Sequence, residues 1–361
     1  MKRMVTFAWN HEGLGHVSRL IAVSQNMLEE WASPLFFVQH EQELITSYRY
    51  PQIILPSYEG AFISDNWWIG KETGVDKKIA ERLSKTIIEE SLRGEHGVIF
   101  HDVVIYKDLY DYGVENNWNQ YYIFRERKDV LDPHKWLSEH APNIKTFFWL
   151  GKYKYEKTVN GVTGIGLPKI TRKLISDNSL WDNEQSELKI VVTPGGGGYF
   201  ETKSFIQDSI HALINFSKLI DLDIDIKIIT GPFFKESLKI PHFPNNTKIE
   251  LIHFLSPEFN MYKNTDIIIA QGGYNTLTES ESSQTNMIIY PRKRTLDDQY
   301  LRALRYKALK NYSICVDDGE LEQTLKKIYM NKTKGTTSQN SPINTKLLHN
   351  EAKRILQKHV L

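Results

Sequence analysis

The chain has 361 residues, more than one hydrophobic core usually supports, and its 40% hydrophobic and 25% charged residues are typical of a globular protein. Lys plus Arg (45) nearly balance Asp plus Glu (44), so no overall field draws the chain to nucleic acid or to an anionic membrane. The single cysteine, Cys315, excludes a disulfide framework and an all-cysteine metal site, and its apolar neighbours predict a core position.

In the first half, short apolar runs alternate with longer helix-like segments, which is typical of βαβ units and parallel sheets. The first apolar run is too short for a signal peptide, and no apolar stretch approaches about 18 residues, so we expect a cytoplasmic protein without a transmembrane segment. Six strands are predicted here, forming one Rossmann-like sheet: residues 5–9, 35–39, 53–56, 98–101, 121–124 and 146–150.

The second half repeats this alternation after a polar, turn-forming stretch, residues 171–187, that predicts a linker. We predict two doubly wound, Rossmann-like α/β domains facing a cleft, residues 1–170 and 188–332. A polar connection, 331–344, and a terminal helix, 345–361, would follow, and we consider that this helix packs back on the first domain. The strands expected in the second sheet are residues 188–193, 224–230, 249–254, 266–270, 287–290 and 313–316.

A glycine turn follows the first predicted strand and contains Gly13, Gly15 and His16. Glycines let the backbone approach a ligand closely, and the N-terminus of the following helix attracts anions. The turn lacks the third glycine of the dinucleotide fingerprint, which argues against a nicotinamide enzyme. The structural alternative is a tight turn whose histidine caps a helix.

A second glycine motif follows residues 188–193 and consists of Gly195, Gly196, Gly197 and Gly198, with Tyr199 after them. Four consecutive glycines are entropically costly, so they predict a loop whose backbone N–H groups cradle an anion such as a diphosphate. The run does not end in Gly-Lys-Ser/Thr, which argues against a P-loop. A merely flexible loop is the alternative.

A third motif ends the predicted strand 266–270 with Gly272 and Gly273. We expect Asn275 or Thr276 to start a helix whose first turn carries Glu279. Asn275 and Glu279 are then one helical turn apart and face one ligand, with phosphate at the helix start and ribose hydroxyls on the carboxylate. The alternative is a capping box formed by Thr276 and Glu279.

A fourth motif, Asp298 and Gln299, opens a predicted helix after the next strand. Adjacent acid and amide groups suit sugar hydroxyls, which need acceptors and donors together. The alternative is a solvated helix end. We interpret the Asp-x-Asp pattern at residues 221–225 as structural, and the scattered histidines match no zinc spacing, so no metal is expected.

The order of these four motifs resembles that of GT-B glycosyltransferases of the MurG and monogalactosyldiacylglycerol synthase type, family 28. The resemblance implies a nucleotide-sugar donor held by the second domain, with Gly13 and Gly15 contributing from the first. It also implies that Glu279 binds the ribose and that Asp298 with Gln299 binds the donor sugar. Asp298 stands where close relatives often carry Gln or Glu, which leaves the sugar open. By the same resemblance, Phe254 and Leu255 lie in the loop that reads the nucleobase, and Tyr274, Asn275 and Thr276 face the diphosphate.

These features predict an inverting, metal-independent sugar transfer from a UDP- or dTDP-linked donor to an acceptor hydroxyl, without a cofactor. His16 is the predicted general base because its unperturbed pKa lies near neutrality, and Asp102 would orient or replace it. The acceptor stays open among a glycan, a lipid-linked glycan and a small natural product. Peripheral contact with the inner face of the cell membrane stays open, as does the role of Trp67 and Trp68 in acceptor binding or in the core.

Two rival functions remain. A faint echo of nucleotide-sugar 2-epimerases at residues 294–297 keeps a non-transferring GT-B enzyme in view. The second rival is a catalytically silent subunit that stabilises a partner transferase. Retention of both the acid–base and the donor motifs favours an active transferase over either rival.

Overall fold

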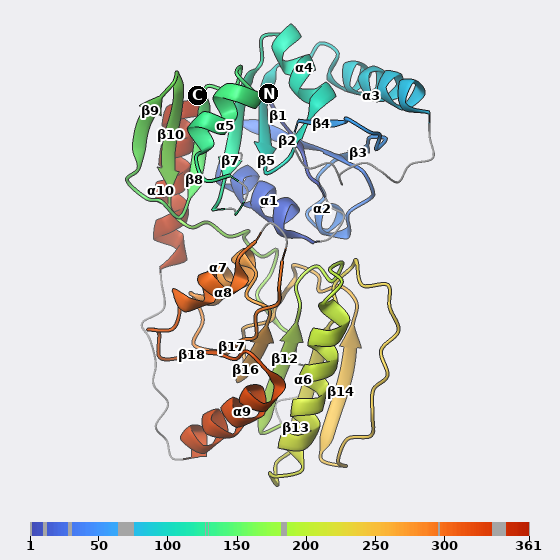
Figure 1. Ribbon diagram of the computed structural model, residues 1–361, viewed down its shortest axis with the longest axis vertical. Helices are drawn as coiled ribbons and strands as arrows, with labels where there is room; N and C mark the ends of the chain where they lie inside the picture. Colours follow the sequence, from blue (N-terminus) through green and yellow to red (C-terminus); the bar gives the residue numbers. More distant parts are fainter. Residues whose placement is uncertain are drawn as a thin grey trace. The chain divides into compact units, whose positions relative to one another are not determined.

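The computed structural model describes residues 2–9, 13–27, 31–63, 76–126, 128, 130–181, 186–294, 297–333 and 344–360 (Figure 1). The chain forms two compact units. The first comprises Met1–Asn10, His16–Lys173 and Thr345–Leu361, and the second comprises His11–Gly15 and Leu174–Asn344. The main segment of the second unit, Leu174–Asn344, is therefore a long insertion into the chain of the first.

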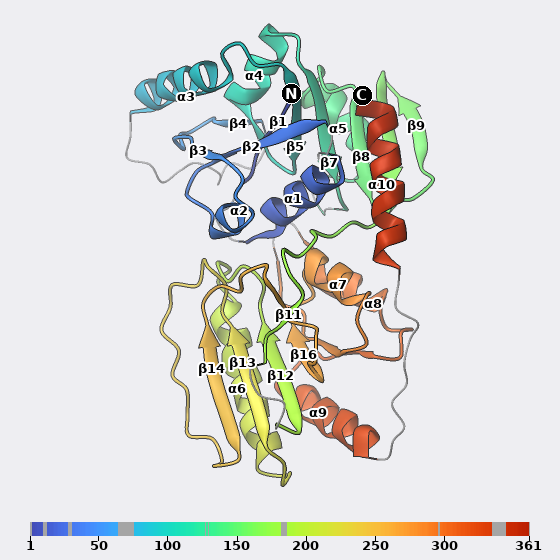
Figure 2. The same cartoon turned by 180° about the vertical axis from the view of Figure 1, so that it is seen from behind.

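The first unit is built on one sheet of eight strands in the order β3-β2-β1-β5-β7-β8-β10-β9. All neighbours pair in parallel except β9, which runs antiparallel to β10 at one edge (Figure 2). The strands are β1 (Lys2–Phe7), β2 (Ala32–Val38), β3 (Gln52–Ile54), β5 (Gly97–Asp102), β7 (Asn119–Phe124), β8 (Thr146–Leu150), β9 (Glu156–Val159) and β10 (Val162–Leu167).

The expected number of six strands is wrong for this sheet, because β9 and β10 were not predicted. β9 is largely exposed, and β10 contains Gly164 and Gly166, which weaken the strand pattern. Both glycines are required by packing. A β-carbon on Gly164 would lie 2.4 Å from the Phe147 ring, and one on Gly166 would lie 1.9 Å from the carbonyl oxygen of Lys152.

The helices of the first unit are α1 (Gly15–Met27), α2 (Glu43–Ser47), α3 (Lys77–Leu92), α4 (Lys107–Glu115), α5 (Pro133–His140) and α10 (Thr345–Val360), and a short hairpin pairs β4 (Phe62–Ile63) with β6 (Ile105–Tyr106). The terminal helix α10 belongs to this unit, where Ala352, Leu356 and Val360 are buried and Tyr121 Oη donates to the His359 carbonyl at 3.3 Å. Apolar residues at a spacing of four place one face of α10 in the core.

The second unit contains a six-stranded, fully parallel sheet in the order β14-β13-β12-β16-β17-β18. This order reverses direction between β12 and β16, the point at which ligands bind in open α/β sheets. Its elements are β12 (Leu188–Thr193), α6 (Thr202–Ser217), β13 (Ile224–Ile229), β14 (Thr247–Ile252), β16 (Ile267–Ala270), α7 (Tyr274–Ser280), β17 (Asn286–Ile289), α8 (Gln299–Leu304), β18 (Tyr312–Ile314) and α9 (Asp318–Thr333).

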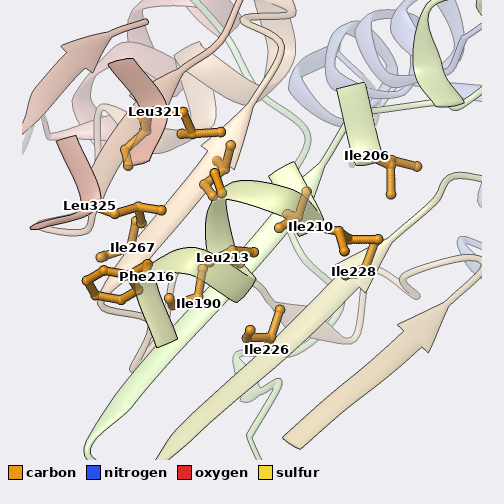
Figure 3. Close-up of a cluster of buried hydrophobic side chains, with 14 of the residues drawn as sticks. Ile190, Ile206, Ile210, Leu213, Phe216, Ile226, Ile228, Ile267, Leu321 and Leu325 are labelled. Carbon is orange, nitrogen blue, oxygen red and sulfur yellow. The ribbon is translucent and has the colours of Figure 1, made fainter. Parts of the chain in front are cut away.

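One core cluster of the second unit lies between one face of this sheet and the helices α6 and α9 (Figure 3). Ile190, Ile226 and Ile267 stand on neighbouring strands and pack against helix residues that include Leu213 and Leu321. Full burial of one such side chain contributes about 1.5–3 kcal/mol, so this cluster is a main source of the unit's stability. Cys315 is fully buried in the same cluster, as its apolar neighbours predicted.

The predicted linker is only partly irregular. Within residues 171–187, β11 (Asn178–Ser179) pairs in parallel with β15 (Phe259–Asn260), and Leu180 and Trp181 are buried in the second unit. The Trp181 indole donates to Thr265 Oγ1 at 2.8 Å. A two-residue strand leaves no periodic pattern in a sequence, so its polar residues were interpreted as a linker.

Candidate active site

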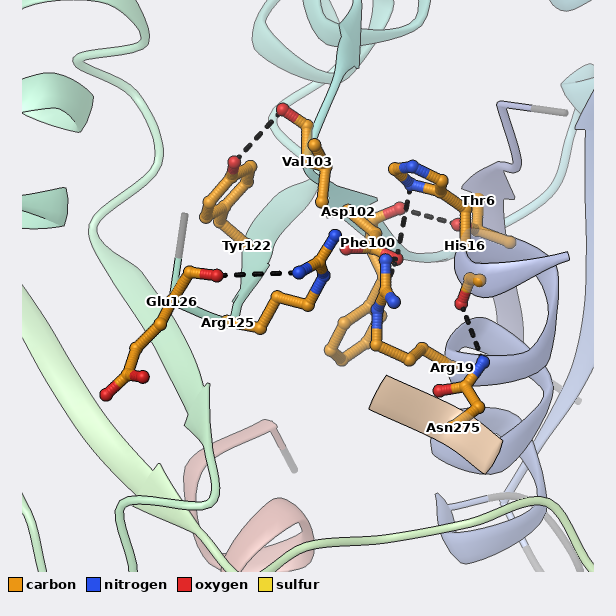
Figure 4. A network of polar contacts seen from close by, with 11 residues as sticks. Thr6, His16, Arg19, Phe100, Asp102, Val103, Tyr122, Arg125, Glu126 and Asn275 are labelled. Atoms are coloured by element: carbon orange, nitrogen blue, oxygen red, sulfur yellow. Dashed lines mark hydrogen bonds and ion pairs between the residues drawn. The ribbon is translucent and has the colours of Figure 1, made fainter. Parts of the chain in front are cut away.

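His16 and Asp102 are brought together by two adjacent parallel strands of the first unit. β1 leads into the turn before α1, which carries His16 as its second residue, and Asp102 is the last residue of β5, the neighbour of β1. Carboxyl ends of adjacent parallel strands share one edge of the sheet, so the side chains meet there. His16 Nδ1 lies 3.5 Å from Asp102 Oδ2 (Figure 4).

Both side chains are buried, with His16 8% and Asp102 1% exposed. Burial alone raises the pKa of Asp102, but the Arg19 charge, followed by His16, outweighs this effect and holds the pKa below its usual value. Burial lowers the pKa of His16, against the opposing effect of Asp102 and with additional lowering by Arg19 and Arg125. At neutral pH the site therefore holds a carboxylate beside a neutral imidazole.

A neutral imidazole next to a carboxylate can act as a general base. Asp102 is an acceptor only, so the proton of the His16 ring belongs on Nδ1, and Nε2 is left with a lone pair that can take a proton. The separation of 3.5 Å is longer than a normal hydrogen bond, and apo sites often tighten when a substrate binds. Because His16 lies inside α1 and faces Asp102, it is not the cap of that helix.

The glycine run follows β12 in the second unit and is a closely packed loop rather than a flexible one. Gly195 and Gly197 have positive φ angles of 88° and 87°. A β-carbon on Gly197 would lie 2.3 Å from the Thr230 carbonyl oxygen, and one on Gly231 would lie 2.4 Å from the Gly195 carbonyl oxygen. Glycine is thus needed here to let two backbone turns approach each other, in addition to any ligand.

The other glycine motif of this unit follows β16, the direct neighbour of β12, so both motifs leave the same edge of the sheet. Helix α7 begins at Tyr274, with Gly273 as an N-cap that has no side-chain capping bond. The expected start at Asn275 or Thr276 is therefore wrong by one or two residues. Thr276 lies inside the helix, which rules out the capping box, and Glu279 lies in the second helical turn rather than the first.

Asn275 lies in the second unit, to which residues His11–Gly15 also belong. Its Nδ2 donates to the Gly15 carbonyl at 3.2 Å (Figure 4). Gly15 is the residue directly before His16. The amide of Asn275 is therefore occupied by the backbone of the first glycine turn.

Asp298 is the N-cap of α8, where its carboxylate accepts from the Leu301 N–H at 2.9 Å. Gln299 is 5% exposed and accepts from the Arg292 N–H at 3.2 Å. The structure thus gives both predicted sugar-binding residues a structural role, and Gln299 is buried rather than part of a solvated helix end.

Two arginines connect these loops, and the sequence predicted a role for neither. The Arg294 guanidinium lies 3.5 Å from the centroid of the Tyr199 ring and donates to Gln271, so it joins the end of the glycine run to the residue before Gly272. Arg302 pairs with Asp297 and donates to the Gly272 carbonyl at 3.2 Å. Arg294 belongs to the basic run at residues 292–294, whereas Arg302 lies in the predicted helix that follows Asp298 and Gln299.

Among the residues that the structure describes, those predicted to bind the nucleobase make no contact that indicates a ligand. Phe254 and Leu255 follow β14, the edge strand of the second sheet, and are partly buried. Trp67 and Trp68 lie outside the described residues. Within the described ranges no cluster of three His, Cys, Asp or Glu side chains suits a metal ion, and no helix there is long and apolar enough to cross a membrane.

Comparison with known proteins indicates which class of enzyme the chain resembles. Residues 206–358 match the family model of the glycosyltransferase family 28 C-terminal domain. No curated protein sequence matches the chain significantly. MurG of Acinetobacter baumannii is similar in structure, with a TM-score of 0.52, 14% identity, and coverage of 98% of this chain and 95% of that chain.

Two other solved structures cover nearly the whole chain. The spinosyn rhamnosyltransferase SpnG, complexed with thymidine diphosphate, has a TM-score of 0.60 and 10% identity and covers 99% of both chains. UGT2 of Phytolacca americana, complexed with UDP-2fluoro-glucose and pterostilbene, has a TM-score of 0.56 and 13% identity and covers 99% of this chain and 96% of that chain.

The two parallel sheets and these structural matches define a GT-B fold, as the sequence predicted. The protein is a glycosyltransferase of this fold, and its residues 206–358 match the C-terminal domain of family 28.

Proposed function

We propose that the protein transfers a sugar from a nucleoside diphosphate sugar to an acceptor hydroxyl, with inversion at the anomeric carbon and without a metal ion. The observation that carries this proposal is the buried pair of His16 and Asp102, in which a neutral imidazole is held beside a carboxylate. A general base of this kind is what an acceptor hydroxyl needs in order to attack.

In the proposed reaction, the acceptor oxygen attacks the anomeric carbon while His16 Nε2 takes its proton. The bond from the anomeric carbon to the diphosphate oxygen breaks, and the nucleoside diphosphate leaves with the bonding electron pair. Asp102 stabilises the imidazolium that forms. One direct displacement without an enzyme nucleophile inverts the anomeric configuration.

The proposed donor site lies in the second unit and rests on the family 28 match and on the glycine motifs that leave the adjacent strands β12 and β16. UDP and dTDP are the nucleotides we propose, because relatives of this fold are described with thymidine diphosphate and with a UDP-sugar. Glu279 would bind the ribose. The other proposed donor contacts are Gly13, Gly15, residues 195–198, Tyr199, Phe254, Leu255, Gly272, Gly273, Tyr274, Asn275, Thr276, Asp298 and Gln299.

The decisive experiment measures release of UDP or dTDP from a panel of UDP- and dTDP-sugars, first with water and then with glycan, lipid-linked and small phenolic acceptors. Donors are ranked beforehand by thermal shift, because a ligand that binds only the folded protein raises its stability. The anomeric configuration of the product is determined by proton NMR. A retained configuration, or a stabilising donor that never yields a glycosylated product, would contradict the proposal. Cytoplasmic location belongs to the same proposal and is tested by cell fractionation.

A further inference from the structure

Arg19 is a buried cation in the candidate active site, and it takes no part in the proposed proton transfer. It stands on α1 three residues after His16, so the two side chains leave the same face of the helix (Figure 4). Only 2% of Arg19 is exposed. Its Nε and Nη2 lie 3.0 and 2.9 Å from Asp102 Oδ2, the same oxygen that His16 Nδ1 approaches at 3.5 Å.

The net charge of His16, Arg19 and Asp102 together depends on whether His16 is protonated. A guanidinium stays protonated in proteins, so Arg19 and the Asp102 carboxylate cancel while His16 is neutral. A proton on His16 would leave a net positive charge in a buried site, where charge is costly. Arg125, which follows β7, adds a further positive charge near both His16 and Asp102.

We propose that Arg19 is a positioning residue that holds Asp102 Oδ2 against His16 Nδ1 and keeps the imidazole in its neutral, Nδ1-protonated form. The role of that imidazole in catalysis rests on the proposed function. The effect of Arg19 on the ring does not, because it is a property of the free protein. Among the residues that the structure describes, Asp102 of β5, Arg19 of α1 and Arg125 after β7 are the charged groups that influence His16.

The lowered pKa of His16 agrees with the positions of Arg19 and Asp102. Burial is the largest cause that lowers the pKa of His16, and Arg19 lowers it further while Asp102 opposes. A group whose basic form is favoured in this way remains a competent base below the ordinary histidine pKa of about 6.5. A purely structural Arg19 would leave the proton affinity of His16 to burial, Asp102 and Arg125.

The test is a titration of His16 in the full chain by long-range nitrogen–proton NMR on histidine-labelled protein, with the His16 signal assigned by its loss in His16→Gln. In the wild type we expect the Nδ1-protonated form and a pKa below 6.5. In Arg19→Gln the pKa should rise by about 1 or more, because a nearby like charge has been removed. Arg125→Gln should raise it less.

Arg3→Gln is the matched control, since it removes an arginine that pairs with Glu95 in the same unit without touching His16. An unchanged His16 pKa in Arg19→Gln would overturn the proposal. Should Arg19→Gln fail to fold, the wild-type titration can still overturn the proposal, because a pKa at or above 6.5 or an Nε2-protonated ring contradicts it, and Arg125→Gln still tests the effect of a nearby arginine charge on His16. The titration is carried out on the protein without donor or acceptor. Its outcome therefore does not depend on whether the protein is an inverting transferase.

Discussion

Gly196 and Gly13 lie so close that a β-carbon on Gly196 would stand 2.5 Å from the Cα of Gly13 and 2.7 Å from the Leu14 nitrogen. These atoms belong to one compact unit, although 183 positions separate them in the chain (196 minus 13). The two glycine motifs that the sequence suggested for ligand binding thus also contact each other through their backbones.

We expect Gly196→Ala to destabilise the second unit by about 1–3 kcal/mol, because the methyl group meets backbone atoms that cannot move aside cheaply. Donor binding should weaken as well, since the loop must shift. Thermal unfolding and calorimetric titration with UDP and dTDP measure the two effects. Gly319→Ala is the control, because its β-carbon meets only ordinary contacts and it lies in helix α9. Equal melting temperatures for the two variants would contradict the steric argument.

His16→Ala should reduce turnover by about 10²–10⁴-fold, the usual cost of losing a general base. Donor affinity and melting temperature should change little, because His16 neither caps α1 nor belongs to the second unit, where the donor site is proposed. Steady-state kinetics and calorimetry on the same preparation separate the two quantities. Near-normal turnover in His16→Ala would sink the assignment of the base.

Asp102→Asn should cost stability as well as turnover. It leaves Arg19 buried without its anion, and breaking a buried pair in this way costs about 3–5 kcal/mol. The lowered pKa of Asp102 means that its contribution is present at neutral pH and is lost as the pH falls through that folded-state pKa. Urea unfolding at pH 7 and at a pH well below 3.8, the ordinary pKa of an Asp carboxyl, should show a smaller pH dependence in Asp102→Asn than in the wild type. A pH dependence equal to that of the wild type would count against this role of Asp102.

Glu279→Ala should weaken donor binding by about 1.5–3 kcal/mol if its carboxylate accepts the ribose hydroxyls, the usual value of a hydrogen bond to a charged group. The exposed Glu258 provides the control variant, Glu258→Ala, in the same unit. Calorimetry with the nucleoside diphosphate and with its 2′-deoxy analogue compares the loss. Equal affinities for Glu279→Ala and the wild type would reject the ribose role.

Turnover should survive an excess of chelator, because the proposed reaction uses the acid–base pair and backbone groups rather than a metal ion. Initial rates are compared with EDTA, with added Mg²⁺ and with added Mn²⁺. Activity that disappears with EDTA and returns only with one of these ions would require a metal-dependent mechanism.

Continuous apolar runs predicted most of the fold. β12 was located to the residue, because Leu188–Thr193 is buried along its whole length and has clear turn residues after it. β9 was missed because it is largely exposed. β10 was missed because its glycines are required by contacts with Phe147 and Lys152, which a local pattern does not contain. The start of α7 was misplaced because Gly273, rather than a side chain, caps it.

The candidate site could be predicted where the type of residue itself indicates the chemistry. It could not be predicted where a residue's position depends on a contact with a residue far away in the sequence. His16 and Asp102 were selected because each follows a strand, and adjacent parallel strands bring them together. Arg19 stood in the same motif, but its importance depends on Asp102, 83 residues away. The contact of Arg294 with Tyr199 is equally nonlocal and left only a short basic run as its trace.

The return of α10 to the first unit has a consequence for synthesis of the chain. Residues Leu174–Asn344 of the second unit leave the ribosome before the helix that completes the first unit has been made. The second unit can therefore finish folding while the face that receives Ala352, Leu356 and Val360 is still uncovered. In this protein the unit that begins the chain is the last to be completed, and a nascent chain that stops before residue 345 presents that apolar face to chaperones.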